Sequence, residues 1–160
     1  MKRLLLILSL SSLFFVGQAQ YNFGHTKKYE SNQTWKVIGV YTGSILLNAV
    51  GDGLNDSGDK QWGHACNAAS IGLLLGSPFI IDYEKDKWYW YLISYTSLRI
   101  SLFDYTYNTT RGLPLGYIGS TSTWDKALSK FRSPETHFGR SVFFIVGFSI
   151  PINELGKKHR

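Results

Sequence analysis

Apolar residues recur along much of this chain at steps of three and four, the spacing that places side chains on one face of an α-helix. Six apolar residues between positions 35 and 54 have this spacing: Val37, Val40, Tyr41, Ile45, Leu46 and Ala49. Thr34 stands directly before them as a candidate N-cap, and Gly58 suits the left-handed conformation of a helix end. The pattern predicts a first helix from Trp35 to about Leu54.

A second helix is predicted from Asp59 to Leu75, because Gly-Ser-Pro at 76–78 interrupts the pattern. This segment is rich in small residues: Gly63, Ala65, Ala68, Ala69, Ser70, Gly72 and Gly76. The pairs Gly39/Gly43 and Gly72/Gly76 have the four-residue spacing that lets helix backbones approach closely. We therefore expect helices packed through Gly/Ala-rich faces, either in lipid or in a tight soluble bundle.

The rest of the chain alternates charged or glycine-rich breaks with apolar segments. Residues 82–87 form a charged hinge, and residues 88–103 contain one charge, Arg99. We favour a helix for 88–103, although residues 97–104 partly alternate and a strand is the competing assignment. Residues 111–119 read as a loop and 122–131 as a short helix. Ser133-Pro134-Glu135 opens a last helix that Pro151 ends.

These elements predict a mainly α fold, a small bundle of about four to five helices after an N-terminal signal peptide. Residues 1–3 (Met-Lys-Arg) are basic, residues 4–16 are apolar, and Gly17-Gln18-Ala19 places small residues where a signal peptidase cleaves. An uncleaved N-terminal anchor is the alternative. We predict a signal peptide at 1–19, a flexible arm at 20–33, one helical domain at 34–156 and a basic tail at 157–160.

Composition and charge narrow the classes of function. The 160 residues carry 17 Lys+Arg against 11 Asp+Glu, a formal charge of +6. Removing residues 1–19 takes away Lys2 and Arg3, so the mature balance is 15 − 11, or +4, with much of the excess near the two ends. Basic residues neither cluster on a helix nor alternate with aromatics, so nucleic acid is not a predicted partner. We predict an exported protein of the periplasm or cell envelope.

Membrane association is allowed by the sequence and not required by it. No apolar stretch after residue 19 reaches about 18 uninterrupted apolar residues, the length typical of a transmembrane helix. The aromatic run at 88–91 (Trp-Tyr-Trp-Tyr) suits a water–lipid interface and also the edge of a core. The expected partners are membrane lipid or another envelope protein.

Polar residues in or beside the apolar helices are the main clue to a site, because a buried charge costs several kcal/mol unless it is paired. The candidate polar cluster or binding residues are Asp52, Asp56, His64, Arg99, Asp104 and Asn108. Arg99 needs an acceptor, and Asp52, Asp56 or Asp104 would supply one. The resulting contact would be a structural ion pair or a site where the guanidinium binds an anionic substrate or lipid phosphate. Asp104 and Asn108 would line a polar pocket or terminate their helix.

The sequence predicts no metal site and no cofactor. His64 has no second ligand at a recognised spacing, and residues 51–59 fail the calcium-loop pattern because Leu54 occupies an acidic position. Cys66, the single cysteine, is expected to be a packing residue. We predict a structural or binding role with a buried polar cluster. The alternative is a metal-dependent or acid/base hydrolase acting on a phosphate- or lipid-bearing envelope substrate, so enzymatic activity stays open.

Overall fold

A computed structural model describes residues 33–119, 130 and 133–155 of the chain. Its long helices are α2 (Gln33–Asp56), α3 (Lys60–Gly76), α4 (Trp88–Arg111) and α6 (Ser133–Ile150). Short helical turns follow or precede them: η1 (Ser77–Phe79), η2 (Lys85–Lys87) and η3 (Pro151–Leu155). No strand occurs within these residues, so the mainly α prediction is confirmed with four long helices.

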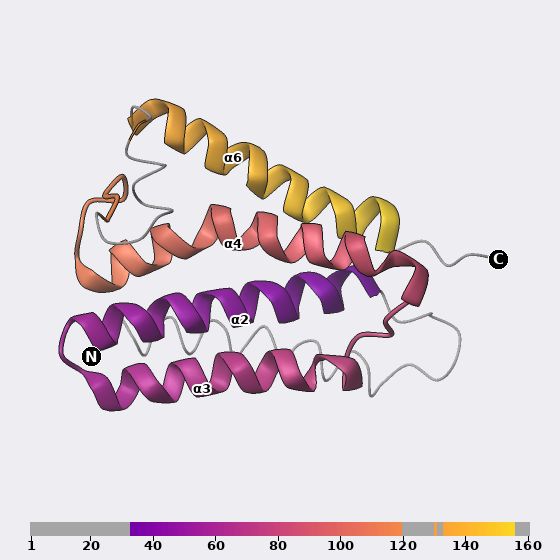
Figure 1. Cartoon of the computed structure of the whole chain (residues 1–160), viewed down its shortest axis with the longest axis horizontal. Helices are drawn as coiled ribbons and strands as arrows, with labels where there is room; N and C mark the ends of the chain where they lie inside the picture. The colour runs from indigo at the N-terminus through magenta and orange to yellow at the C-terminus, as the bar shows by residue number, and fades with distance from the viewer. Residues whose placement is uncertain (1–32, 120–129, 131–132, 156–160) are drawn as a thin grey trace.

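The four helices lie side by side in the order α3, α2, α4, α6 (Figure 1). The contacts agree, since α2 packs against both α3 and α4, and α6 packs against α4. The starts of α2 and α4 and the ends of α3 and α6 lie at one end of this row, which we call the hinge end because residues 82–87 lie there. The opposite end, which we call the turn end, holds the turn between α2 and α3. The result is a row of helices in which α2 and α4 are the inner members.

Two helices end at a glycine in the left-handed conformation, as predicted for Gly58 and not foreseen for Gly112. Gly58 follows α2 with φ 93°, and Gly112 ends α4 with φ 71°, both in the left-handed region that favours glycine. The N–H of Gly112 donates to the carbonyl oxygens of Asn108 and Thr109, which would otherwise lack helical partners. Local sequence therefore determines where these two helices stop.

Other boundaries differ from the predictions. Thr34 is not an N-cap: it lies inside α2, is buried, and donates its hydroxyl to the carbonyl oxygen of Pro151 at 3.0 Å, tying the start of α2 to the end of α6. The strand alternative at 97–104 is wrong, because α4 continues through it to Arg111, and the helix predicted for 88–103 is therefore too short. The α-helical pattern of α6 ends before Pro151, as predicted, and one π-helical turn follows.

Several predicted segments lie outside the described residues. These are the signal peptide at 1–19, the arm at 20–33 except for Gln33, which begins α2, nearly all of the short helix at 122–131 and the basic tail at 157–160.

Glycines allow α2 and α3 to approach closely near the turn end. A Cβ atom on Gly51 would lie 2.8 Å from the carbonyl oxygen of Gly63, and a Cβ on Gly63 would lie 2.8 Å from that of Gly51. The predicted pair Gly72/Gly76 makes no such contact, since nothing within the described structure lies within 4 Å of a Cβ added there. α3 is an edge helix of the row, so only one side of it meets a neighbour.

Candidate functional site

A chain of side-chain hydrogen bonds crosses three helices. Arg99 on α4 donates from Nη1 to Oδ1 of Asn48 on α2 at 2.8 Å. Asn48 donates from Nδ2 to Oδ1 of Asn67 on α3 at 3.0 Å, and Asn67 donates to Oδ1 of Asp52 on α2 at 2.8 Å. We call these four residues the Asn48 network. They link Asp52 and Arg99, two of the predicted site residues, through two asparagines.

The acceptor of Arg99 therefore differs from the prediction. An amide oxygen takes the place of the expected carboxylate, and no carboxylate of the described residues forms an ion pair with Arg99. The guanidinium carbon also lies 4.5 Å from the centre of the Phe103 ring, a cation–π contact. The prediction failed because the α2 side chain within reach of the guanidinium is that of Asn48, one helical turn before Asp52.

Asp56 belongs to a second set at the turn end. It accepts a hydrogen bond from the hydroxyl of Tyr107, which in turn accepts one from Nη1 of Arg111 at 2.9 Å. The same Arg111 nitrogen lies 4.0 Å from Oδ2 of Asp56. Burial and the hydrogen bond to Asp56 raise the pKa of Tyr107, so its phenol stays protonated and donates. This exposed set joins the ends of α2 and α4.

Asp104 belongs to a third set, between α4 and α6. Its Oδ2 lies 2.5 Å from Nη2 of Arg140, which is only 3% exposed. The Arg140 guanidinium lies 5.0 Å from the centre of the Tyr105 ring, and the Tyr105 hydroxyl lies 2.5 Å from Nδ1 of His137. We call Asp104, Tyr105, His137 and Arg140 the Arg140 cluster.

The last two predicted residues lie apart from these sets. Asn108 is 1% exposed and donates from Nδ2 to the carbonyl oxygens of Leu115 at 3.2 Å and Tyr117 at 2.9 Å, so it holds the following loop against the end of α4. This placement matches the helix-terminating role considered for it. His64 is exposed on α3 and makes no hydrogen bond or ion pair with the part of the chain that the structure describes.

The six predicted residues thus occupy separate places and do not surround one pocket. Within the described ranges, no group of three or more His, Cys, Asp or Glu side chains is arranged to hold a metal ion. The hydrolase alternative needed these side chains to converge. Nothing in the observed geometry favours it.

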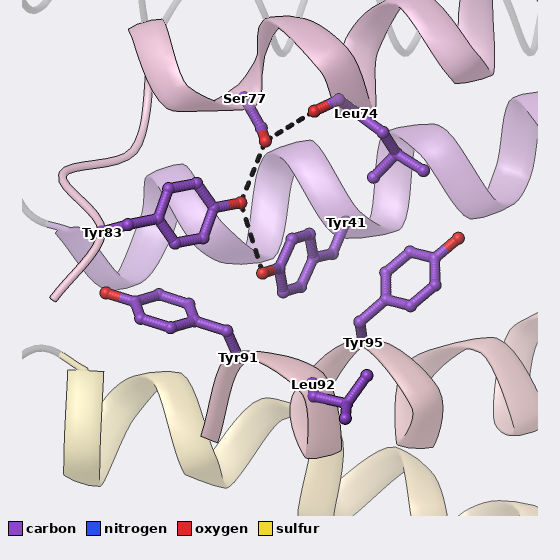
Figure 2. A pocket seen from close by; sticks show the side chains of 7 residues that line it. All are labelled: Tyr41, Leu74, Ser77, Tyr83, Tyr91, Leu92 and Tyr95. Carbon is purple, nitrogen blue, oxygen red and sulfur yellow. Dashed lines mark hydrogen bonds between the residues drawn. The ribbon is translucent and has the colours of Figure 1, made fainter. Parts of the chain in front are cut away.

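An open pocket of about 360 Å³ lies at the hinge end, over α2 and between α3 and α4 (Figure 2). It is lined by four tyrosines and three other residues: Tyr41, Tyr83, Tyr91, Tyr95, Leu74, Ser77 and Leu92. The Tyr83 hydroxyl lies 2.9 Å from the Ser77 hydroxyl and 3.4 Å from that of Tyr41. The pocket therefore offers aromatic faces and hydroxyl groups, with no charged side chain in its lining.

Sequence reasoning missed Asn48, Asn67 and Arg140. Asn48 is one helical turn from Asp52, and Asn67 lies within an apolar, small-residue helix, so both were polar residues on otherwise apolar segments. Arg140 is the single basic residue between 138 and 150, the same signal that singled out Arg99. The four tyrosines carried no such signal, because they come from three segments that only the fold brings together.

Comparison with known proteins adds no family to this picture. No protein-family model matches the chain, and no curated protein or solved structure is significantly similar to it. Any function must therefore be inferred from the residues described above.

Proposed function

We propose that this chain is an exported protein of the cell envelope that associates with a membrane through the exposed apolar side chains of its helix row. In this proposal its role is structural or binding, and the polar sets between the helices hold the row together. Small-residue contacts such as Gly51/Gly63 support the close helix packing that the proposal includes.

The exposure of large apolar side chains, together with polar side chains buried among the apolar core, carries the proposal. Serine, asparagine and arginine side chains are almost fully buried, namely Ser44, Ser94, Ser101, Asn108 and Arg140. Large apolar side chains are more than half exposed: Trp62, Ile71, Leu75, Phe79, Trp88, Leu92, Leu115, Phe138, Ile145 and Ile152. A soluble domain rarely exposes large apolar side chains on this scale, whereas a helix bundle in lipid packs through small and polar residues.

The positions of the charges agree with this proposal. Uncharged stretches occupy all four helices, at 37–51, 65–76, 88–98 and 141–150. At 1.5 Å per residue each extends over roughly 15–22 Å. Beyond these stretches Arg99 and Arg140 are bonded to partners on neighbouring helices, as intramembrane charges generally are.

Hydropathy alone does not indicate membrane association. Among the described helices only α2 is long and apolar enough to cross a membrane, and 56% of its apolar stretch is buried within the protein. The core helix of a soluble protein meets the same criterion, so the proposal is based on which side chains are exposed and not on the apolar length of α2.

Extraction of isolated membranes tests the proposal. We expect the mature protein to stay in the pellet through washes with high salt and with alkaline carbonate, and to be released by detergent. A peripheral protein held by its basic tail would leave with salt, and a protein bound only to an envelope partner would leave with carbonate. Release by either wash would contradict association through the apolar surface. Deleting residues 157–160 serves as the control, since the proposal expects no change in carbonate resistance.

A further inference from the structure

Arg140 is a buried guanidinium whose hydrogen bonds are incomplete. Nη2 meets Asp104, but Nε and Nη1 are both buried and have no hydrogen-bond acceptor within the described structure. A buried donor without an acceptor costs about 1–3 kcal/mol, and more for a charged group. Two such donors on one side chain that is 3% exposed indicate that acceptor oxygens belong beside it.

The surroundings of Arg140 limit which chemical groups can supply these acceptor oxygens. One face of the guanidinium lies over the Tyr105 ring, so acceptors must approach in the guanidinium plane, where its N–H groups point. Guanidinium binds the oxygens of phosphate and carboxylate groups through parallel N–H···O bonds. One turn further along α6, Phe143 and Phe144 are 39% and 40% exposed, so apolar surface adjoins the site.

We propose that Arg140 binds a phosphate group between α4 and α6, with Nε and Nη1 donating to its oxygens while Asp104 holds Nη2. The inference gives a ligand to the binding role proposed above and rests on that role. The phosphate is carried by a lipid headgroup or is free inorganic phosphate. If the phosphate belongs to a lipid, its acyl chains would pack against Phe143 and Phe144.

Arg111 provides a matched control within the same chain. It also lies over a tyrosine ring, with its guanidinium carbon 5.6 Å from the centre of the Tyr107 ring, and it also neighbours an aspartate, Asp56, at 4.0 Å. Unlike Arg140, it is exposed to solvent. Replacing it by lysine keeps the positive charge and removes a guanidinium from the same end of the row without touching the unpaired donors of Arg140.

Equilibrium dialysis of the protein in a phosphate-free, sugar-headed detergent tests the proposal. With radiolabelled inorganic phosphate, wild type and Arg111→Lys should take up one phosphate per chain, and Arg140→Lys should bind at least about tenfold more weakly, because lysine loses the fork of N–H donors. Adding dihexanoyl phosphatidylglycerol distinguishes the sources. Displacement of the label indicates a lipid headgroup, and its retention indicates free phosphate.

The proposal is overturned if wild type takes up neither probe saturably, which would leave water as the acceptor, or if Arg111→Lys weakens binding as much as Arg140→Lys. Should Arg140→Lys fail to fold, the absence of saturable uptake by wild type would still overturn the proposal. Carbonate extraction of the wild-type protein, set beside its phosphate uptake, separates the two proposals. Membrane retention without phosphate binding would contradict only the phosphate site, and loss of wild-type retention would contradict membrane association.

Discussion

Adding a single methyl group at Gly63 should loosen the contact between α2 and α3. The new Cβ would lie 2.8 Å from the carbonyl oxygen of Gly51 and against the side chain of Asn55, closer than real Cβ atoms come to their neighbours. Since the first of these contacts is with backbone, the two helices must separate. That movement lengthens the bonds of Asn67 to Asn48 and Asp52.

The magnitude follows from three contributions. Overpacking costs about 1–3 kcal/mol, and each weakened hydrogen bond costs about 1 kcal/mol. In the opposite direction, replacing glycine by alanine inside a helix stabilises the helix by about 1 kcal/mol. Gly63→Ala should therefore lower the free energy of unfolding by about 2–4 kcal/mol. For a chain of this size that is a fall of roughly 4–16 °C in Tm.

Gly72→Ala is the control, because it lies on the same helix and a Cβ there meets nothing within 4 Å in the described structure. It should raise the stability by about 0.5–1 kcal/mol through helix propensity alone. Thermal unfolding of the two purified variants, followed by circular dichroism, provides the comparison. Equal midpoints, or a Gly63→Ala midpoint above that of wild type, would refute the close approach of α2 and α3.

Three further substitutions test other parts of the structure. A double-mutant cycle of Asn48→Ala and Arg99→Ala should give a coupling energy of about 1 kcal/mol in denaturant unfolding, and additive effects would show that their hydrogen bond contributes nothing. Thr34→Val should lower stability by about 1 kcal/mol because the buried bond to the end of α6 is lost; an unchanged midpoint would argue against that tether. Ile145→Lys, at a position 62% exposed, should reduce carbonate-resistant protein, while Tyr117→Lys in the loop should not. Equal retention of both lysine variants would mean that α6 does not face lipid.

Helix positions were predictable because their signals are local. The three- and four-residue steps, Gly58 and the Ser133-Pro134 start act within a few residues of the element they define. Residues 97–104 were ambiguous because strand and helix formers mix there, and packing against α2 and α6 decides for helix. Local patterns therefore located the helices, although they gave Thr34 the wrong role and ended α4 too early.

The polar partners were not predictable in the same way, because they depend on which helices are neighbours. The sequence indicated that Arg99 needs an acceptor, but choosing Asn48 over an aspartate requires the helix order. The same holds for the glycines. Gly51 and Gly63 lie where α2 meets α3, whereas a Cβ added at Gly72 or Gly76 would have no neighbour within 4 Å in the described structure. Ligand binding by the predicted site residues stays a prediction.

Membrane association through the exposed apolar surface is the central claim, and spin-label accessibility in lipid vesicles tests it most directly. In a Cys66→Ser background, single cysteines at Ile71 and Ile145, which are 58% and 62% exposed, would carry the label, with Asp86 in the hinge as the aqueous reference. The account predicts that labels at 71 and 145 are reached by dissolved oxygen and shielded from a water-soluble nickel complex, with the opposite result at 86. Equal access of nickel to all three positions would contradict it.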